Sequence, residues 1–238
     1  MFSRKYTVDT THTDANFNLK ISSLFYMFQD VATAHVEELG LGKDKVIDKG
    51  MYWVITRYSV SINKLPKYLE NIVVKTYPGN DMKFIFPRYF KVENESGEVL
   101  ITASSTWVIL NKLTHKIVLH PFNNFHVSPV HLIDEEPLPG KVAFIEPNNV
   151  MERRVHFTDL DLNCHLNNTK YIDYIIDMHD LDFYCKKEIK HLTINFDREI
   201  KMDEKVMLSE QYLNDTEIVI GQVNGENAFS AEVLYKNL

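Results

Sequence analysis

The chain has 238 residues, of which 45% are hydrophobic and 25% are charged, and this is ordinary for a globular protein of one large or two smaller domains. Its net charge of −7 argues against a general nucleic-acid binder, which needs a basic face. No run approaches the roughly 20 apolar residues of a membrane helix, and the charged start MFSRKYTVDT is unlike a secretory signal. We therefore expect a cytoplasmic protein in which Cys164 and Cys185 are free thiols.

Near the start of the chain, the segment ISSLFYMFQDVATAHVEELG predicts one long helix. Its apolar residues recur at helical spacing, and Gly40 ends the pattern as a typical C-terminal stop. Four β-branched or alternating runs follow, separated by turn signals such as Pro78-Gly79. These predicted strands are WVITRYSVSI, NIVVKTY, FIFPRYFKVE and VLITASSTWVIL.

A proline-rich segment then divides the chain. Five of the eight prolines lie between Pro121 and Pro147, and proline removes a backbone donor and restricts the residue before it. The segment shows neither helical nor strand periodicity, so we expect an extended linker over residues 121–150. Its flanks, residues 1–120 and 151–238, would be the two domains.

The second half repeats the plan of the first. The pattern D-x-N-x-(N/H)-L begins at Asp14 and again at Asp161, each time before an apolar segment. HLTINF, KVMLSEQYL, TEIVIGQVN and AFSAEVLYK are the predicted strands of this half. A long helix followed by antiparallel strands, twice over, predicts an α+β protein and resembles two tandem hot-dog domains, in each of which a curved sheet wraps a helix.

The stretch DLDLNCHLNNTKY, residues 159–171, allows several interpretations. Its opening resembles a calcium loop, but Cys164 and Lys170 replace the Gly and Glu that such a loop needs. Adjacent Cys164 and His165 point to opposite sides of an extended segment, which disfavours a nucleophile and its base. A helix cap is expected from the Asn residues ahead of the helix.

Capping does not account for the alternation of Asp161, Asn163 and His165. In an extended strand these three side chains would project from one face, close to the free N–H groups of a helix start. A carboxylate, an amide and an imidazole together suit acyl transfer or hydration. A purely structural polar cluster is the alternative.

At this point the sequence resembles a known family. RRVHFTDLDLNCHLNNTKYIDY is similar to the motif D-x-N-x-H-(V/L)-N-N-x-K-Y of acyl-acyl-carrier-protein thioesterases, and every fixed element of that motif is present. GMYWVITRYSVSINKLPKY and GEVLITASSTWVILNKLTHK resemble two further strands of the family. The likeness extends from about residue 5 to the C-terminus.

The resemblance implies catalytic roles for Asp161, Asn163, His165 and Glu199. Ile200 stands where the family often has Cys, so a nucleophilic Cys at that position cannot be essential here. In the first half Asn18 corresponds to His165 and Leu65 to Glu199, so we expect that half to supply the acyl pocket. The implied activity is hydrolysis of acyl carrier protein thioesters in fatty acid biosynthesis, with no cofactor or metal and with a possible homodimer.

We expect the acyl chain to contact the first helix and the strands that face it, although plain core packing could explain each of these residues. The candidates are Leu24, Phe25, Phe28, Val31, Trp53 and Phe84. A hot-dog acyl-CoA thioesterase, a hydratase and a catalytically silent acyl-binding protein are the alternative functions.

Overall fold

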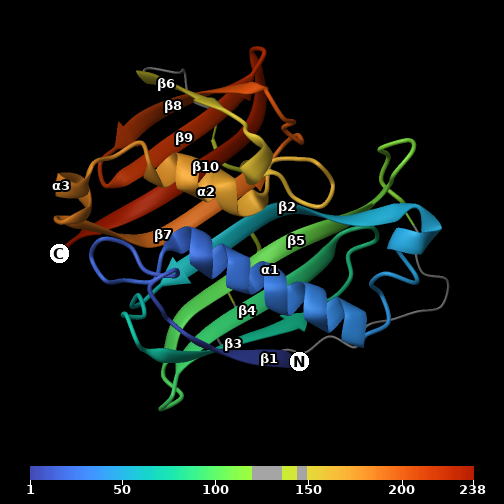
Figure 1. Ribbon diagram of the computed structural model, residues 1–238, viewed down its shortest axis with the longest axis horizontal. Coiled ribbons are helices and arrows are strands. Elements are labelled where there is room, and N and C mark those ends of the chain that lie inside the picture. The colour runs from blue at the N-terminus through green and yellow to red at the C-terminus, as the bar shows by residue number, and fades with distance from the viewer. Residues whose placement is uncertain (120–135, 144–148) are drawn as a thin grey trace.

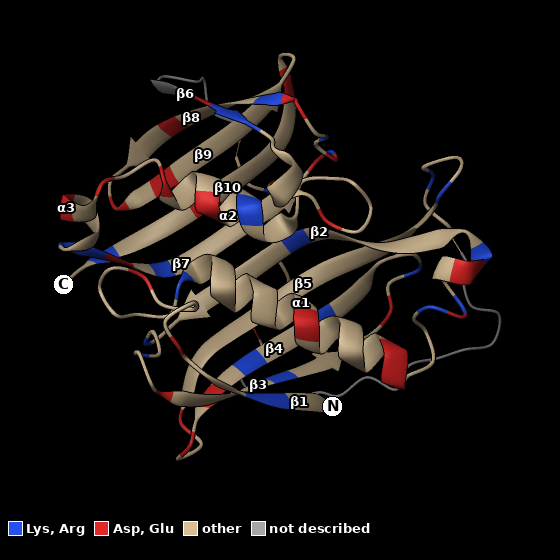
Figure 2. Ribbon diagram, viewed as in Figure 1, with Lys and Arg blue, Asp and Glu red and all other residues tan. Residues whose placement is uncertain are grey.

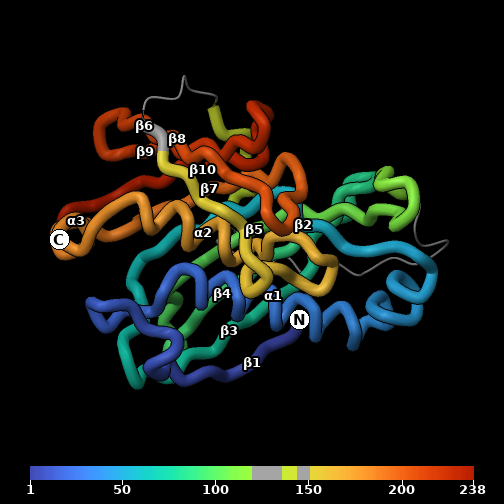
Figure 3. The backbone as a smooth tube through the Cα atoms, turned by 45° about the horizontal axis from the view of Figure 1, so that its top comes forward, coloured from blue at the N-terminus to red at the C-terminus, as the bar shows by residue number. Residues whose placement is uncertain are grey.

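The protein forms one ten-stranded antiparallel sheet with its helices on one face (Figures 1 and 3). The computed structural model describes residues 1–119, 136–143 and 149–238. The strand order is β1-β3-β4-β5-β2-β7-β10-β9-β8-β6. None of the helices in these ranges is long and apolar enough to cross a membrane.

Both halves contribute five strands to this sheet. The elements of the first half are β1 (Phe2–Thr7), α1 (Ile21–Glu38), the 3-10 turn η1 (Ile47–Lys49), β2 (Met51–Ile62), β3 (Asn71–Pro78), β4 (Phe86–Asn94) and β5 (Val99–Asn111). Those of the second half are β6 (Asn149–Arg154), η2 (Phe157–Asp159), α2 (Asn168–Ile176), α3 (Leu181–Tyr184), β7 (Lys187–Phe196), β8 (Lys205–Leu213), β9 (Thr216–Val223) and β10 (Glu226–Asn237).

The two halves share one topology. Read from its outer edge, the first half-sheet runs β1-β3-β4-β5-β2 and the second runs β6-β8-β9-β10-β7. Antiparallel pairing of β2 with β7, with Ser59 opposite Thr193, joins them into one continuous sheet. The structure therefore confirms the tandem hot-dog arrangement.

Matching hydrogen bonds align the halves residue by residue. Isolated bridges join Asn18 to Lys67 in the first half and His165 to Lys201 in the second. In the same way, the Leu19 amide donates to Pro66 O at 2.8 Å and the Leu166 amide to Ile200 O at 2.7 Å. One residue before these carbonyls lie Leu65 and Glu199, so the structure makes them equivalent, as predicted.

Helix α1 packs its apolar stripe onto the first half-sheet (Figure 1). The Phe28 ring packs against Tyr58 of β2 and Phe90 of β4, with ring centroids 6.2 Å and 4.6 Å away. Helix α2 has only 9 residues, and is shorter than predicted. The helix ends at Ile176, and His179, just beyond it, lies beside Glu217, with Nε2 3.1 Å from Oε2.

Two strands were missed by the sequence patterns. β1 and β6 are the edges of the sheet, and both carry charged residues, as exposed edges commonly do. Such strands lack the apolar alternation by which the inner strands are predicted.

Only part of the predicted linker belongs to the described residues. Residues 136–143 form neither helix nor strand, and they are bound to the sheet rather than free of it. Ser59 Oγ donates to Glu136 Oε1 at 2.9 Å, and Asn195 Nδ2 donates to Gly140 O at 3.0 Å. The linker's proposed bounds stay a prediction, since residues 120–135 and 144–148 lie outside the described ranges.

Candidate active site

The Asp161–His165 segment is a tight turn and not the extended strand that its alternation predicted. Asp161 Oδ1 accepts the backbone N–H groups of Asn163 at 2.8 Å and His165 at 3.1 Å. The Asp161 amide in turn donates to His165 O at 2.7 Å, and Cys164 adopts a φ of 61°. The prediction of a strand was wrong because a carboxylate that binds its own downstream amides folds the chain back.

The same turn occurs in the first half. Asp14 Oδ1 accepts the N–H groups of Asn16 and Asn18, both at 2.9 Å, and Phe17 has a φ of 60°. A shared aspartate therefore has a structural role in both halves. In the second half it presents an imidazole where the first half has an amide.

His165 and Glu199 meet at the end of this turn. His165 Nε2 lies 3.3 Å from Glu199 Oε2, and their side chains are 16% and 29% exposed, so the pair is partly shielded yet open to a substrate. The adjoining Ile200 is fully buried, and its carbonyl accepts the Leu166 amide. Glu199 is thus held beside His165 by the backbone bond between its neighbour Ile200 and Leu166, while the Ile200 side chain belongs to the core.

The first half also reaches this site, which the sequence patterns did not indicate. Tyr52 of β2 donates its hydroxyl hydrogen to Glu199 Oε1 at 2.9 Å. His115, in the loop after β5, places Nδ1 3.3 Å from the same hydroxyl. Burial and the hydrogen bond to Glu199 raise the pKa of Tyr52 to about 12.

Asn163 is exposed, and its side-chain amide has no hydrogen bond to any other described residue, so Nδ2 is free to bind a substrate oxygen. At the start of α2, Asn167 Oδ1 accepts the Thr169 amide at 3.0 Å, as expected of a cap. Cys164 and Cys185 are free and exposed, as predicted.

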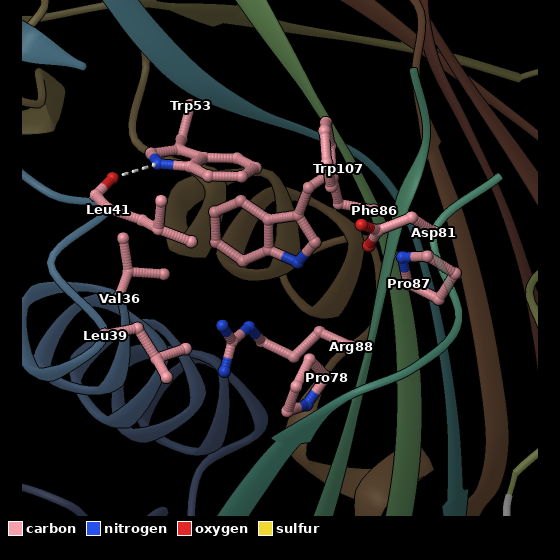
Figure 4. Close-up of a pocket in the computed structure, with 10 residues that line it drawn as sticks. All are labelled: Val36, Leu39, Leu41, Trp53, Pro78, Asp81, Phe86, Pro87, Arg88 and Trp107. Carbon is pink, nitrogen blue, oxygen red and sulfur yellow. Dashed lines mark hydrogen bonds between the residues drawn. The ribbon is translucent and has the colours of Figure 1, made fainter. Parts of the chain in front are cut away.

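The residues predicted to hold the acyl chain lie in three different places. Leu24, Phe25, Phe28 and Val31 are almost wholly buried in the closed core. Trp53 lines a pocket at the C-terminal end of α1 (Figure 4), and its Nε1 donates to Leu41 O at 3.1 Å. Phe84 lies in the turn before β4 and not in that pocket.

The pocket is mainly apolar, and its two charged lining residues are the buried Arg88 and the exposed Asp81. Its walls include Val36 and Leu39 of α1, the indoles of Trp53 and Trp107, and Arg88 (Figure 4). The cavity has a volume of about 30 Å³, room for about one or two waters. A bound acyl chain would have to displace its walls.

Arg88 and His35 form a buried polar contact behind this pocket. Arg88 Nη1 lies 3.1 Å from His35 Nδ1, and because a guanidinium only donates, the imidazole accepts and must be neutral. Burial, aided by the charge of Arg88, lowers the pKa of His35 to about 4. Burial likewise lowers the pKa of Arg88 to about 10.

This contact predicts a stability loss in mild acid. Below pH 6.5 the unfolded chain protonates His35 while the folded chain does not until about pH 4, so the unfolding free energy falls as the pH falls. His35→Gln keeps an acceptor for Arg88 and removes the titration. Urea unfolding should show wild type losing about 2 kcal/mol more than the variant between pH 7 and pH 5. Parallel losses in the two proteins would contradict this assignment.

Two models of one protein family match the two halves of the chain. Residues 1–121 match the Acyl-ACP thioesterase N-terminal domain and residues 144–237 the Acyl-ACP thioesterase C-terminal domain. A palmitoyl-acyl carrier protein thioesterase of Arabidopsis thaliana chloroplasts is 26% identical over 218 residues, which are 85% of this chain and 53% of the relative. The chain thus spans about half the length of that relative.

Solved structures show the same fold over nearly the full chain. An acyl-ACP thioesterase from Bacteroides thetaiotaomicron superposes with a TM-score of 0.87 at 22% identity, covering 98% of this chain and 97% of that one. The 12:0-ACP thioesterase of Umbellularia californica gives 0.85 at 18% identity, covering 100% and 97%. With both family domains matched in order along its length, the chain belongs to the acyl-ACP thioesterase family.

Proposed function

We propose that the protein hydrolyses acyl-acyl-carrier-protein thioesters to a free fatty acid and the carrier thiol. The contact between His165 Nε2 and Glu199 Oε2 at 3.3 Å carries this proposal. The duplicated fold supplies the comparison, because the equivalent turn of the first half has Asn18 and Leu65 at these positions. An acid–base pair therefore exists in only one of two otherwise matching turns.

The pair suits general base catalysis on water. Water attacks the carbonyl carbon while His165 and Glu199 take one of its protons, and that proton passes to the sulfur as the C–S bond breaks. The second proton leaves with ionisation of the acid product. Asn163 Nδ2 is available to stabilise the oxyanion, a role that commonly contributes a few kcal/mol. Asp161 shapes the turn, so we assign it positioning and not nucleophilic attack.

The acyl chain is proposed to enter the first half through the pocket of Trp53, Trp107 and Arg88. The matching region of the second half is filled. Arg88, which lines the pocket, and Glu217 hold equivalent positions, because the strand-paired rows Tyr58–Ser105–Arg88 and Leu192–Val233–Glu217 match. Tyr58 itself does not line the pocket. Fully buried Glu217 accepts the Tyr235 hydroxyl at 2.7 Å and contacts His179, on which the Phe183 ring stacks at 4.0 Å. Because this polar and aromatic cluster occupies the equivalent region of the second half, we place the acyl chain in the first half.

We propose that the carrier docks on the loop after β5. Residues 111–119 contain Lys112 and Lys116 but no Asp or Glu (Figure 2), and Leu113 is 90% exposed. The loop borders the site, because it carries His115. A cationic surface with an exposed apolar side chain complements a carrier whose pantetheine arm is attached through a phosphodiester, which is an anion.

The docking proposal predicts a KM effect that depends on the carrier. Lys112→Glu combined with Lys116→Glu should raise KM for an acyl carrier protein thioester by about tenfold at low salt. KM for acyl-pantetheine, which has neither carrier nor phosphate, should stay unchanged. The matched control is the double variant Lys5→Glu and Lys64→Glu, because these two lysines are exposed and lie far from the loop after β5. Equal KM values for both double variants would refute the docking surface.

Purified protein should be assayed with acyl carrier protein, acyl-CoA and enoyl thioesters. Thiol release together with free fatty acid from the carrier substrate supports the proposal. Preference for acyl-CoA, water addition without thiol release, or binding without turnover would instead favour the CoA thioesterase, the hydratase or the silent binding protein. A cytoplasmic location and a homodimer stay predictions.

A further inference from the structure

Glu199 is held from both halves of the protein. Its Oε2 faces His165 of the second half, and its Oε1 accepts the hydroxyl of Tyr52 from the first. We propose that Tyr52 is a positioning residue for thioester hydrolysis, which orients Glu199 toward His165 and is itself directed by His115. The inference rests on the proposed function and names the part that the first half plays in the chemistry.

The donors and acceptors run in one direction. A carboxylate only accepts hydrogen bonds, so the Tyr52 hydroxyl donates its single hydrogen to Glu199 Oε1. The hydroxyl oxygen can then accept from His115 Nδ1, 3.3 Å away, which places the imidazole hydrogen on that nitrogen. Since burial and Glu199 raise the pKa of Tyr52 to about 12, the phenol keeps its hydrogen at physiological pH.

The sheet fixes the place of this chain of contacts. Tyr52 pairs with Leu110 and Met51 with Asn111, so the first residues of β2 lie beside the loop that carries His115. β2 is also the strand that pairs with the second half, which brings Tyr52 to the boundary between halves. Tyr52 is 9% exposed, whereas the Glu199 side chain is 29% exposed.

A carboxylate with that much exposure can adopt several rotamers, of which the one facing His165 is productive. A buried phenol on a central strand cannot move with it, and so it selects the productive orientation. Losing alignment of a catalytic group commonly costs up to about 10²-fold in rate. The expected effect falls on kcat, because Tyr52 restrains Glu199 whether or not substrate is bound.

Tyr52→Phe tests the proposal by deleting one oxygen atom. We expect kcat to fall by about 10–100-fold with KM and the melting temperature nearly unchanged. Tyr58→Phe is the matched control on the same strand, because the Tyr58 hydroxyl is buried without a hydrogen-bond partner among the described residues. That variant should retain the wild-type kcat.

Variants of His115 provide a second test of the proposal. His115→Ala should lower kcat by about three- to tenfold in wild type and have no further effect in the Tyr52→Phe background, as expected of coupled residues. His115→Asn should retain activity, because its amide can donate in place of Nδ1 and Asn tolerates the φ of 53° at this position. Additive losses in the double variant would overturn the role given to His115.

The outcomes separate this inference from the proposed function. An active wild type with an equally active Tyr52→Phe variant would overturn the role of Tyr52 and leave the hydrolase proposal intact. A stable wild type that releases no thiol from any acyl thioester would overturn the hydrolase proposal itself. A drop in kcat for Tyr52→Phe that Tyr58→Phe reproduces would show a structural effect and also overturn the role.

Discussion

Replacing Glu199 with Gln is expected to lower kcat for thioester hydrolysis by about 10²–10⁴-fold, the usual range for loss of a general base. Gln has the same shape and can still accept from Tyr52, whose hydroxyl is 2.9 Å from Oε1. It cannot take a proton from water or stabilise a charged His165, which is 3.3 Å from Oε2. Because Glu199 is partly exposed, the melting temperature should change little.

The duplicated fold offers a control for this variant. Leu65 occupies the equivalent position of the first half, and Leu65→Gln makes a comparable polar change without touching the acid–base pair. Steady-state kinetics of the two variants should differ by at least about tenfold in kcat. Wild-type turnover by Glu199→Gln would remove Glu199 from the catalytic pair.

Asp161 should respond very differently to Ala and to Asn. Its Oδ1 accepts two backbone N–H groups, and Asn can supply an equivalent oxygen whereas Ala cannot. We expect Asp161→Ala to reduce kcat by about 10²-fold or more, because His165 loses its position. Asp161→Asn should keep most of the wild-type kcat, because the positioning role requires only an oxygen that accepts these two N–H groups.

The copy of this turn in the first half provides the matching comparison. Asp14→Ala removes the same pair of backbone hydrogen bonds, and should lower stability by about 1–3 kcal/mol while kcat stays near wild type. Thermal unfolding and steady-state kinetics measure both effects. An inactive but folded Asp161→Asn variant would show that the carboxylate charge takes part in the reaction, against the positioning role.

The sequence predicted the elements whose packing follows from periodicity. The stripe of α1 and the eight inner strands are apolar at regular spacing, and that spacing reflects burial directly. α2 was predicted too long: it ends at Ile176, and His179 beyond it contacts Glu217, 38 positions away, a contact that no local sequence pattern indicates. The edges β1 and β6 carry too many charges to show strand alternation.

The site could be predicted only in part, because its contacts join residues that are far apart in the sequence. The D-x-N-x-H alternation imitates a strand, although its repetition at Asp14 was a sign that a structural turn was shared by both halves. Tyr52 and Glu199 are 147 positions apart, so no motif could join them. A helical stripe also cannot distinguish Phe28, which is buried in the closed core, from Val36, which borders a pocket.

The most direct test converts the second turn into a copy of the first. The double variant His165→Asn and Glu199→Leu gives that turn the residues found at Asn18 and Leu65. Thiol release from an acyl carrier protein substrate should be measured for this variant and for wild type at equal concentrations. We predict that wild type releases thiol rapidly and that the folded double variant releases none. Undiminished release by that variant would contradict the claim that one imidazole and one carboxylate make this turn a hydrolase.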